Sequence, residues 1–592
     1  MTWTLFSKQR IGEKHVQPPP ISAVVIPAEA SSAKPHHVFP LVMLVLMGAA
    51  VLLVDATLPL RGLWFYDVLP RTPVASWLLL PSHLLFPGLP TAFFQPGMRT
   101  SQAGPLSLAW KETGILFASL VLLFSLYLLA IHRLAGRVSL RFILCSTLVL
   151  GILFTLIPVV TSQDIFSYIG YMHLGVFFHL NPLTTLPTAL HNDPLQVWIY
   201  WLHQPSAYGP AWFLLTGALQ ELTLLAGLKQ VEVMVLLLRW FSLGAHLGST
   251  VLIWSISQRL PLPTDGASTL SPSRRLGAIL AFAWNPFLLL EAGVNAHNDI
   301  TILFLVLLAL WFLVRFPVTL RGLALAAALL AAAAGIKITL SLLLPGLLLF
   351  LWRKPSRRGR SLLVTLGAYL GTILVLYAPF WQHGQVLHFL LINPGSAHEQ
   401  NSLYEFLLRL YAGFRGSYIA PATQLSGSHL ENLVHLISIT SLMLAYGGLV
   451  VWALLPSQGL KNIADLLRWM AMAWLVYLLV GSPWFWPWYA ITLFGLCALL
   501  EASSARFQRV LGVLDLPRAE RMATFSLLTL YCWLSLAPVK TLIPHLHLFQ
   551  VAYLRGLWIW LPPLLAVCAW PLWNQLQTQR NERKALCKEN PR

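Results

Sequence analysis

The sequence predicts an all-α integral membrane protein that crosses the bilayer about fourteen times. Only 10% of its 592 residues are charged and 57% are hydrophobic, and its mean hydropathy is +0.69. Apolar runs of roughly 20 residues recur along the chain, which is the length that spans a bilayer. Short clusters of Lys and Arg separate these runs, as expected for loops that set membrane topology.

The predicted spans follow from the apolar runs in chain order. They are residues 39–58, 113–132, 140–160, 231–257, 276–294, 300–316, 319–336, 338–352, 361–381, 431–455, 467–483, 487–502, 523–541 and 555–573. Two further apolar stretches, 74–90 and 208–228, are predicted to stay on the outer side, the second as a helix that dips into the membrane. If neither stretch crosses the membrane, all the basic clusters between spans fall on one side. We therefore expect a plasma-membrane protein with both termini in the cytoplasm.

The net charge of +18 does not indicate nucleic-acid binding, because the basic residues sit between spans, where they contact lipid headgroups. Five predicted regions follow from this organisation. They are a flexible cytoplasmic arm (1–38), accessory spans (39–139), a catalytic membrane module whose first large outer loop is 161–230 (140–381), an outer loop with substrate-lining spans (382–502), and C-terminal spans with a basic cytoplasmic tail (503–592).

The segment 161–212 contains two Asp and four His but no Lys or Arg. Lipid-embedded segments rarely carry ionisable residues, and cytoplasmic loops are usually basic, so this segment is predicted to be an extracytoplasmic active-site loop. It begins with an amphipathic helix that we expect to lie along the membrane surface with its polar face toward a cavity. The polar face carries Asp164, Ser167, Tyr168, Tyr171, Gly175 and His179, and the apolar face Ile165, Ile169, Met172, Val176 and Leu180. A second interpretation stays open, in which Asp164 only caps this helix.

Two His-Asn-Asp triplets lie in predicted outer loops. The first contains His191 and Asp193, and the second is His297, Asn298 and Asp299. Both are candidate substrate-binding groups, although Asn and Asp also form turns and caps without any further role. His and Asp together can bind a divalent cation, but neither Asp-x-Asp nor His-Glu-x-x-His occurs. We therefore predict no metal site and no cofactor, with a divalent cation as the less favoured alternative.

Other candidates lie at the outer ends of predicted spans. Lys337 would meet a lipid phosphate as a point charge, or else extend its ammonium group to the interface. Tyr208 precedes the re-entrant helix, and His398 lies in the loop 382–430. Trp486 and Trp488 belong to an aromatic cluster that either anchors the protein at the interface or forms a wall for a sugar ring or prenyl chain.

The order of these parts resembles the GT-C superfamily of membrane glycosyltransferases. DIFSYIGYMHLGVFFHLNPL, SAYGPAW, WNP with NAHND, AGIK and PWFWPWY follow one another between residues 140 and 500. This series is similar to the polyprenyl-phosphate-mannose-dependent mannosyltransferases of bacterial cell envelopes. The resemblance implies inverting sugar transfer from a polyprenyl-phosphate donor to a glycan or glycolipid acceptor, with Asp164 as general base. It also implies that Lys337 stabilises the departing phosphate.

Two other functions remain open from the sequence. A transporter or flippase for a lipid-linked saccharide would more often show paired repeats with charged groups near the midplane, whereas here the polar residues gather at one face. A ligase that moves a whole glycan from its lipid carrier would share the same outer loops.

Overall fold

The regular secondary structure of the described residues is helical apart from four strands of two residues each. The computed structural model describes residues 38–58, 66–67, 80–85, 106–157, 159–191, 193–260, 272–317, 319–354, 358–387, 400–414, 429–455, 460–503, 509–510, 514–535 and 554–566. Strand β1 (Tyr66–Asp67) pairs antiparallel with β2 (Val159–Val160), and β3 (Arg509–Val510) pairs with β4 (Leu514–Asp515). Residues 1–37 of the predicted cytoplasmic arm, the predicted basic tail and His398 lie outside the described residues.

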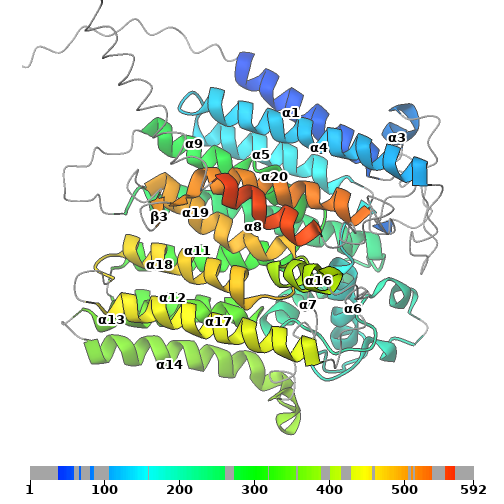
Figure 1. Ribbon diagram of the computed structural model, residues 1–592. Coiled ribbons are helices and arrows are strands. Elements are labelled where there is room, and N and C mark those ends of the chain that lie inside the picture. Colours follow the sequence, from blue (N-terminus) through cyan, green and yellow to red (C-terminus); the bar gives the residue numbers. More distant parts are fainter. Residues whose placement is uncertain are drawn as a thin grey trace, which may run out of the picture.

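The helices form one bundle in which most of them run lengthwise (Figure 1). They are α1 (Val38–Thr57), α3 (Leu80–Leu85), α4 (Leu106–Leu134), α5 (Leu140–Thr155), α6 (Asp164–Val176), α7 (Pro210–Leu225), α8 (Val231–Ser257), α9 (Pro272–Ala283), α10 (Pro286–Gly293), α11 (Asn298–Arg315), α12 (Leu320–Ala334), α13 (Leu344–Trp352), α14 (Arg358–Tyr377), α16 (Leu403–Phe414), α17 (His429–Leu454), α18 (Ile463–Val476), α19 (Ile491–Ser503), α20 (Leu516–Ser535) and a helix over residues 554–566.

Each of the fourteen predicted spans overlaps a helix, but the number of crossings is not confirmed. Among the described residues, seven helices are long and apolar enough to cross a membrane, or eight if α9 and α10 form one span bent by 43°. The break between these two helices falls at Asn285, whose side chain accepts from Phe287 N and Leu288 N and so caps α10. Four more apolar helices are shorter, with 10–17 residues each.

The two segments predicted not to cross are short helices. Within 74–90 the structure describes only α3, and α7 is too short to qualify as a span. Helices α6, α7 and α16 lie together at the right-hand end of the bundle in Figure 1. The opposite helix ends carry basic residues, such as Arg315 at the end of α11, Arg321 at the start of α12 and Arg358 at the start of α14. The bundle therefore has one basic end and one end built from the long loops.

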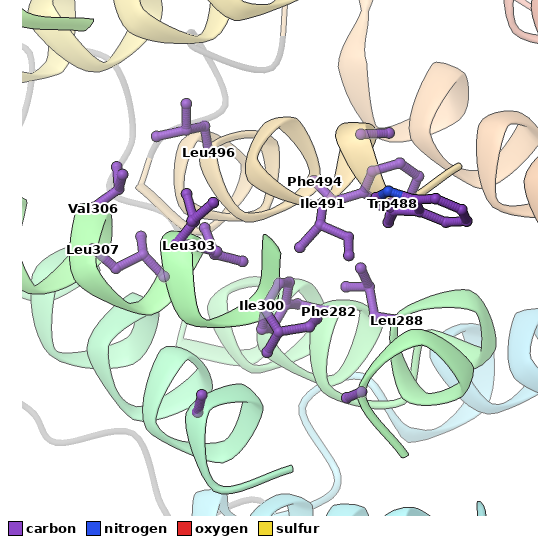
Figure 2. Close-up of a cluster of buried hydrophobic side chains, with 14 of the residues drawn as sticks. Phe282, Leu288, Ile300, Leu303, Val306, Leu307, Trp488, Ile491, Phe494 and Leu496 are labelled. Atoms are coloured by element: carbon purple, nitrogen blue, oxygen red, sulfur yellow. The ribbon is translucent and has the colours of Figure 1, made fainter. Parts of the chain in front are cut away.

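Helix α19 forms the centre of the core and contacts α8, α9, α11, α18 and α20. Leu288 from α10 and Ile300 from α11 pack beneath Trp488 and Ile491 (Figure 2). All four side chains are at most 6% exposed. This apolar cluster supports the loop end of the bundle directly under the aromatic turn that precedes α19.

The prediction that α6 lies along the membrane surface is not confirmed. Every residue from Ile165 to Leu174 is buried, because α6 packs against α7, α8 and the 3-10 helices η1 (Pro187–Ala189) and η2 (Pro194–Trp198). The helix also ends at Val176, so His179 lies beyond it, in a left-handed conformation with φ of 53°. The loop 161–230 therefore folds over α6 and covers it.

Candidate functional site

The candidate site is centred on Asp164, the first residue of α6. The backbone N–H of Asp164 donates to Ser162 Oγ at 3.3 Å, so Ser162 supplies the side-chain acceptor at this helix start. The carboxylate of Asp164 is directed toward another loop, where its Oδ2 lies 3.8 Å from His297 Nδ1. The side chain of Asp164 is 16% exposed, whereas that of His297 is fully buried. Asp164 is thus the partly exposed member of this pair, and His297 is the buried member.

His297 is held on several sides. Its ring stacks on Trp488 with a centroid distance of 3.9 Å and an angle of 17°, and Trp488 stacks in turn on Trp486 at 5.0 Å and 8°. The Tyr168 hydroxyl lies 3.4 Å from His297 Nδ1. On the other edge, His297 Nε2 lies 3.3 Å from Glu291 Oε2. The aromatic cluster therefore supports the imidazole next to Asp164, in addition to any contact with substrate.

A buried polar network fixes the loop that carries His297. The side chain of Asn295 accepts from the Thr161 N–H at 3.0 Å and donates to Glu291 Oε2 at 3.1 Å. The Tyr531 hydroxyl from α20 donates to Glu291 Oε1. Since Thr161 lies three residues before Asp164, this network joins the chain leading to Asp164 with the chain leading to His297.

Arg239 of α8 joins the same two chain segments. Its guanidinium donates to the carbonyls of Thr155 and Ile157 at 2.9 and 2.7 Å, and to the carbonyl of Val294 at 2.8 Å. Asp55 of α1 interacts with it electrostatically. A buried Arg that satisfies helix-terminal carbonyls holds backbone segments in one arrangement. Arg239 therefore sets the starting points of the loops that carry Asp164 and His297.

The cationic part of the site is Lys337, which follows α12. Its Nζ donates to Asp299 Oδ2 at 2.5 Å and lies 4.5 Å from the centre of the Tyr489 ring. The Lys337 side chain is 16% exposed, while that of Asp299 is 3% exposed. The Lys337 ammonium group is therefore not extended toward the lipid interface. Asp299 and Tyr489 hold it at the loop end of the bundle.

The start of α7 lies directly against the turn between α12 and Lys337. The Gly209 N–H donates to the Ile336 carbonyl at 2.9 Å, and the Ala211 N–H donates to the Gly335 carbonyl at 3.0 Å. A Cβ atom on Gly209 would lie 2.3 Å from the Gly335 carbonyl oxygen. Glycine is needed at position 209 because any side chain would separate the two backbones.

We expect Gly209→Ala to destabilise the protein by about 1 to 3 kcal/mol, since backbone atoms must move apart to accept the methyl group. The measurement is thermal unfolding in detergent. Gly367→Ala in α14 is the matched control, because a Cβ there has no neighbouring atom within 4 Å. Equal melting temperatures for the two variants would contradict the importance of this contact.

Burial controls the electrostatics of Asp164. Removal from water raises the pKa of Asp164 to about 6, while the nearby charge of Lys337 and a hydrogen bond from Tyr208 act in the lowering direction. Burial also holds the pKa of His297 well below its ordinary value, and Lys337 adds to this effect. His297 is therefore neutral at pH 7, and Asp164 changes its charge close to physiological pH.

Tyr208 and Tyr168 complete the wall beside Asp164. Their rings meet edge to face with a centroid distance of 4.9 Å, and both side chains are buried. The Tyr168 hydroxyl also accepts from the Asn298 N–H at 3.5 Å. Asn298 itself is fully buried. These predicted residues come together with Asp164, His297, Asp299 and Lys337.

Three residues predicted to bind substrate do not face Asp164. Asp193 caps η2 by accepting from the Leu195 N–H at 2.8 Å, and its other oxygen lies 2.9 Å from His173 Nδ1. Burial acts to raise the pKa of Asp193, but these two hydrogen bonds outweigh it and lower the pKa. Tyr171 donates to the Gln204 carbonyl, and His191 is exposed. The first His-Asn-Asp triplet therefore has a structural role at its Asp.

Arg239, Asn295 and Tyr531 are important for the site but were not among the predicted site residues. A single Arg inside the apolar run 231–257 is a signal that sequence reasoning could have used, because ionisable residues within membrane helices are costly without partners. Tyr531 gave no such signal, since it lies among apolar residues far along the chain.

A metal site is not evident in the part of the chain that the structure describes, where no group of three His, Cys, Asp or Glu side chains is placed to hold an ion. The carboxylates of Asp164 and Asp299 are instead engaged with His297 and Lys337, respectively.

The chain was compared with protein families, curated proteins and solved structures. Residues 93–353 match the MptA_B family, described as alpha-(1->6)-mannopyranosyltransferase, N-terminal domain. No curated protein and no solved structure matches the chain. The matched segment contains Asp164, Tyr208, His297, Asp299 and Lys337. The aromatic turn with Trp486 and Trp488 and the C-terminal helices follow it.

Proposed function

We propose that the protein is a membrane mannosyltransferase, because residues 93–353 match the N-terminal domain of an alpha-(1->6)-mannopyranosyltransferase family and seven or eight of the described helices could cross a membrane. The protein transfers a mannosyl group from a polyprenyl-phosphate carrier to a hydroxyl of a glycan or glycolipid acceptor. The anomeric configuration inverts, and the reaction takes place on the extracytoplasmic side of the plasma membrane.

The observation that carries this proposal is a partly exposed acid and a partly exposed cation at the same end of the bundle. Asp164 interacts electrostatically with Lys337, and each side chain is 16% exposed while their partners His297 and Asp299 are buried. A glycosyl transfer needs a base for the acceptor hydroxyl and a positive charge for the departing phosphate. Asp164 and Lys337 supply these two groups.

The proposed step is a single displacement. Asp164 takes the proton of the acceptor hydroxyl, the acceptor oxygen forms a bond to the anomeric carbon, and the bond from that carbon to the phosphate oxygen breaks. The leaving polyprenyl phosphate keeps the electron pair, and Lys337 stabilises its charge. Neutral His297 orients the Asp164 carboxylate from behind, and Asp299 orients the Lys337 ammonium.

The distribution of charge supports the proposed side of the membrane. The helix ends opposite the site carry Arg315, Arg321 and Arg358, and the segment 161–212 carries no basic residue. Basic residues favour the cytoplasmic side, and this charge pattern supports an extracytoplasmic site. Nucleotide sugars are cytoplasmic, so a lipid-borne donor fits this location.

The test is donor choice by the purified protein. We expect transfer of labelled mannose from polyprenyl phosphomannose to an oligomannoside acceptor, and none from GDP-mannose. NMR of the new linkage should show the anomeric configuration opposite to that of the donor. Transfer from GDP-mannose would overturn the proposed donor. Movement of lipid-linked sugar across vesicles without transfer would indicate a flippase, and transfer of a whole glycan would indicate a ligase.

A further inference from the structure

A second feature, outside the acid and cation described above, is an apolar pocket between four helices. It lies between α18, α19, α20 and the helix over residues 554–566, and its volume is about 350 Å³. It is lined by aliphatic and aromatic side chains together with Met472, Cys497 and several alanines, and its one ionisable lining residue is Glu520. All of these elements lie beyond the segment that matches the mannosyltransferase family.

The chemistry of this lining excludes a sugar or a phosphate as its occupant. Apolar cavities stay free of water and bind hydrocarbon molecules, and a polar ligand would lose its hydrogen bonds there. In a membrane bundle the available hydrocarbon is a lipid chain. A cavity of about 150 Å³ binds benzene, so this pocket has room for roughly fourteen carbons, or about three isoprene units.

One end of the pocket adjoins the candidate site. Its lining includes Phe485 and Ala490, which flank the turn that carries Trp486, Trp488 and Tyr489. The Tyr489 ring lies under the Lys337 ammonium group at 4.5 Å. A lipid phosphate held by Lys337 would therefore lie near the part of the pocket that Phe485 and Ala490 line.

Ionisable residues lie at the other end of the pocket. Glu520 lines it there, and Arg521 contacts Glu520 at 3.3 Å and Glu501 at 3.0 Å. Hydrocarbon does not pass a buried charge cluster. Along α19 the lining runs from Ala490 to Cys497, which is about 10 Å at the rise of an α-helix. The pocket thus has a limited depth.

We propose that this pocket binds the phosphate-proximal isoprene units of the donor's prenyl chain. The inference rests on the proposed function, because it identifies the occupant as the donor. In this arrangement the C-terminal helices bind the prenyl chain of the donor. Residues 93–353 supply the acid, Asp164, and the cation, Lys337.

The experiment is photolabelling of the full-length protein in nanodiscs. The probe is a polyprenyl phosphate with a photoreactive group in its second isoprene unit, and labelled peptides are identified by mass spectrometry. We expect label on peptides containing Cys497, Leu527 or Trp560.

Ala523→Leu fills the pocket and should lower labelling and raise the KM for the donor about tenfold. Ala445→Leu, on the exposed face of α17, is the matched control and should change neither.

The outcomes separate this inference from the catalytic proposal. Asp164→Asn should keep the labelling and lose transfer. If it retains transfer, the catalytic proposal fails whatever the labelling shows. If a phospholipid with a photoreactive acyl chain labels the same peptides and polyprenyl phosphate does not displace it, the pocket holds bilayer lipid and the inference is overturned. Ala519→Leu fills the same pocket and takes the place of Ala523→Leu should that variant not fold.

Discussion

Asp164→Asn is expected to lower kcat by about 10² to 10⁴ while the protein remains folded. The substitution keeps the size of the side chain but removes the only group that we assign to take the acceptor proton. Donor binding should persist, because Lys337 and the apolar pocket are unchanged. The measurement is steady-state transfer of labelled mannose, with KM for donor and acceptor determined separately.

The matched control for this variant is Glu221→Gln, which makes the same acid-to-amide change at an exposed residue of α7. Its kcat should stay within about twofold of the unmodified protein, as surface changes away from a site have small effects. If Asp164→Asn keeps most of the transfer activity, or if both variants lose it equally, Asp164 is not the base.

The loop end of the bundle was largely predictable from the sequence. The distribution of Lys and Arg predicted that the long outer loops lie at the end of the bundle opposite the basic clusters. Polar residues in apolar surroundings then indicated which positions in those loops are candidate site residues. Asp164, His297, Asp299 and Lys337 come from three separate loops, and the structure brings them together. Their catalytic and binding roles stay predictions.

The contacts that hold these residues were not predictable in the same way. Arg239 donates to carbonyls of residues more than fifty positions away, and Tyr531 reaches Glu291 across 240 positions. Hydropathy indicates that a segment is buried but not which helix lies beside it. The burial of both faces of α6 was missed for the same reason, since the loop that covers it follows it in the chain.

The number of crossings also depends on packing. Asn285 divides one predicted span into α9 and α10, and Gly335 ends α12 after 15 residues. In such places a local turn competes with a continuous helix. Short and broken helices near the loop end bring Lys337 and Trp488 close to Asp164, and straight spans would not do so.

Lys337→Gln is expected to reduce kcat by about 10² to 10³, comparable to the loss of one group that stabilises a developing oxyanion. It should also change the pH dependence. Transfer requires the deprotonated form of Asp164, so activity of the unmodified protein should fall as the pH drops through about 6, the raised pKa of Asp164. Lys337 lowers that pKa against the effect of burial. Without the ammonium group, the acid limb of the profile should move to a pH above 6.

Lys337→Arg is the control, because it keeps the positive charge. Its acid limb should stay near pH 6 even if the altered geometry slows the reaction. The Gln variant leaves the Asp299 carboxylate buried without its partner, which costs about 3 to 5 kcal/mol, so rates must be measured per folded protein. A general loss of structure would lower kcat at every pH without moving the limb. An acid limb that stays in place in Lys337→Gln would therefore show that Lys337 does not act on Asp164.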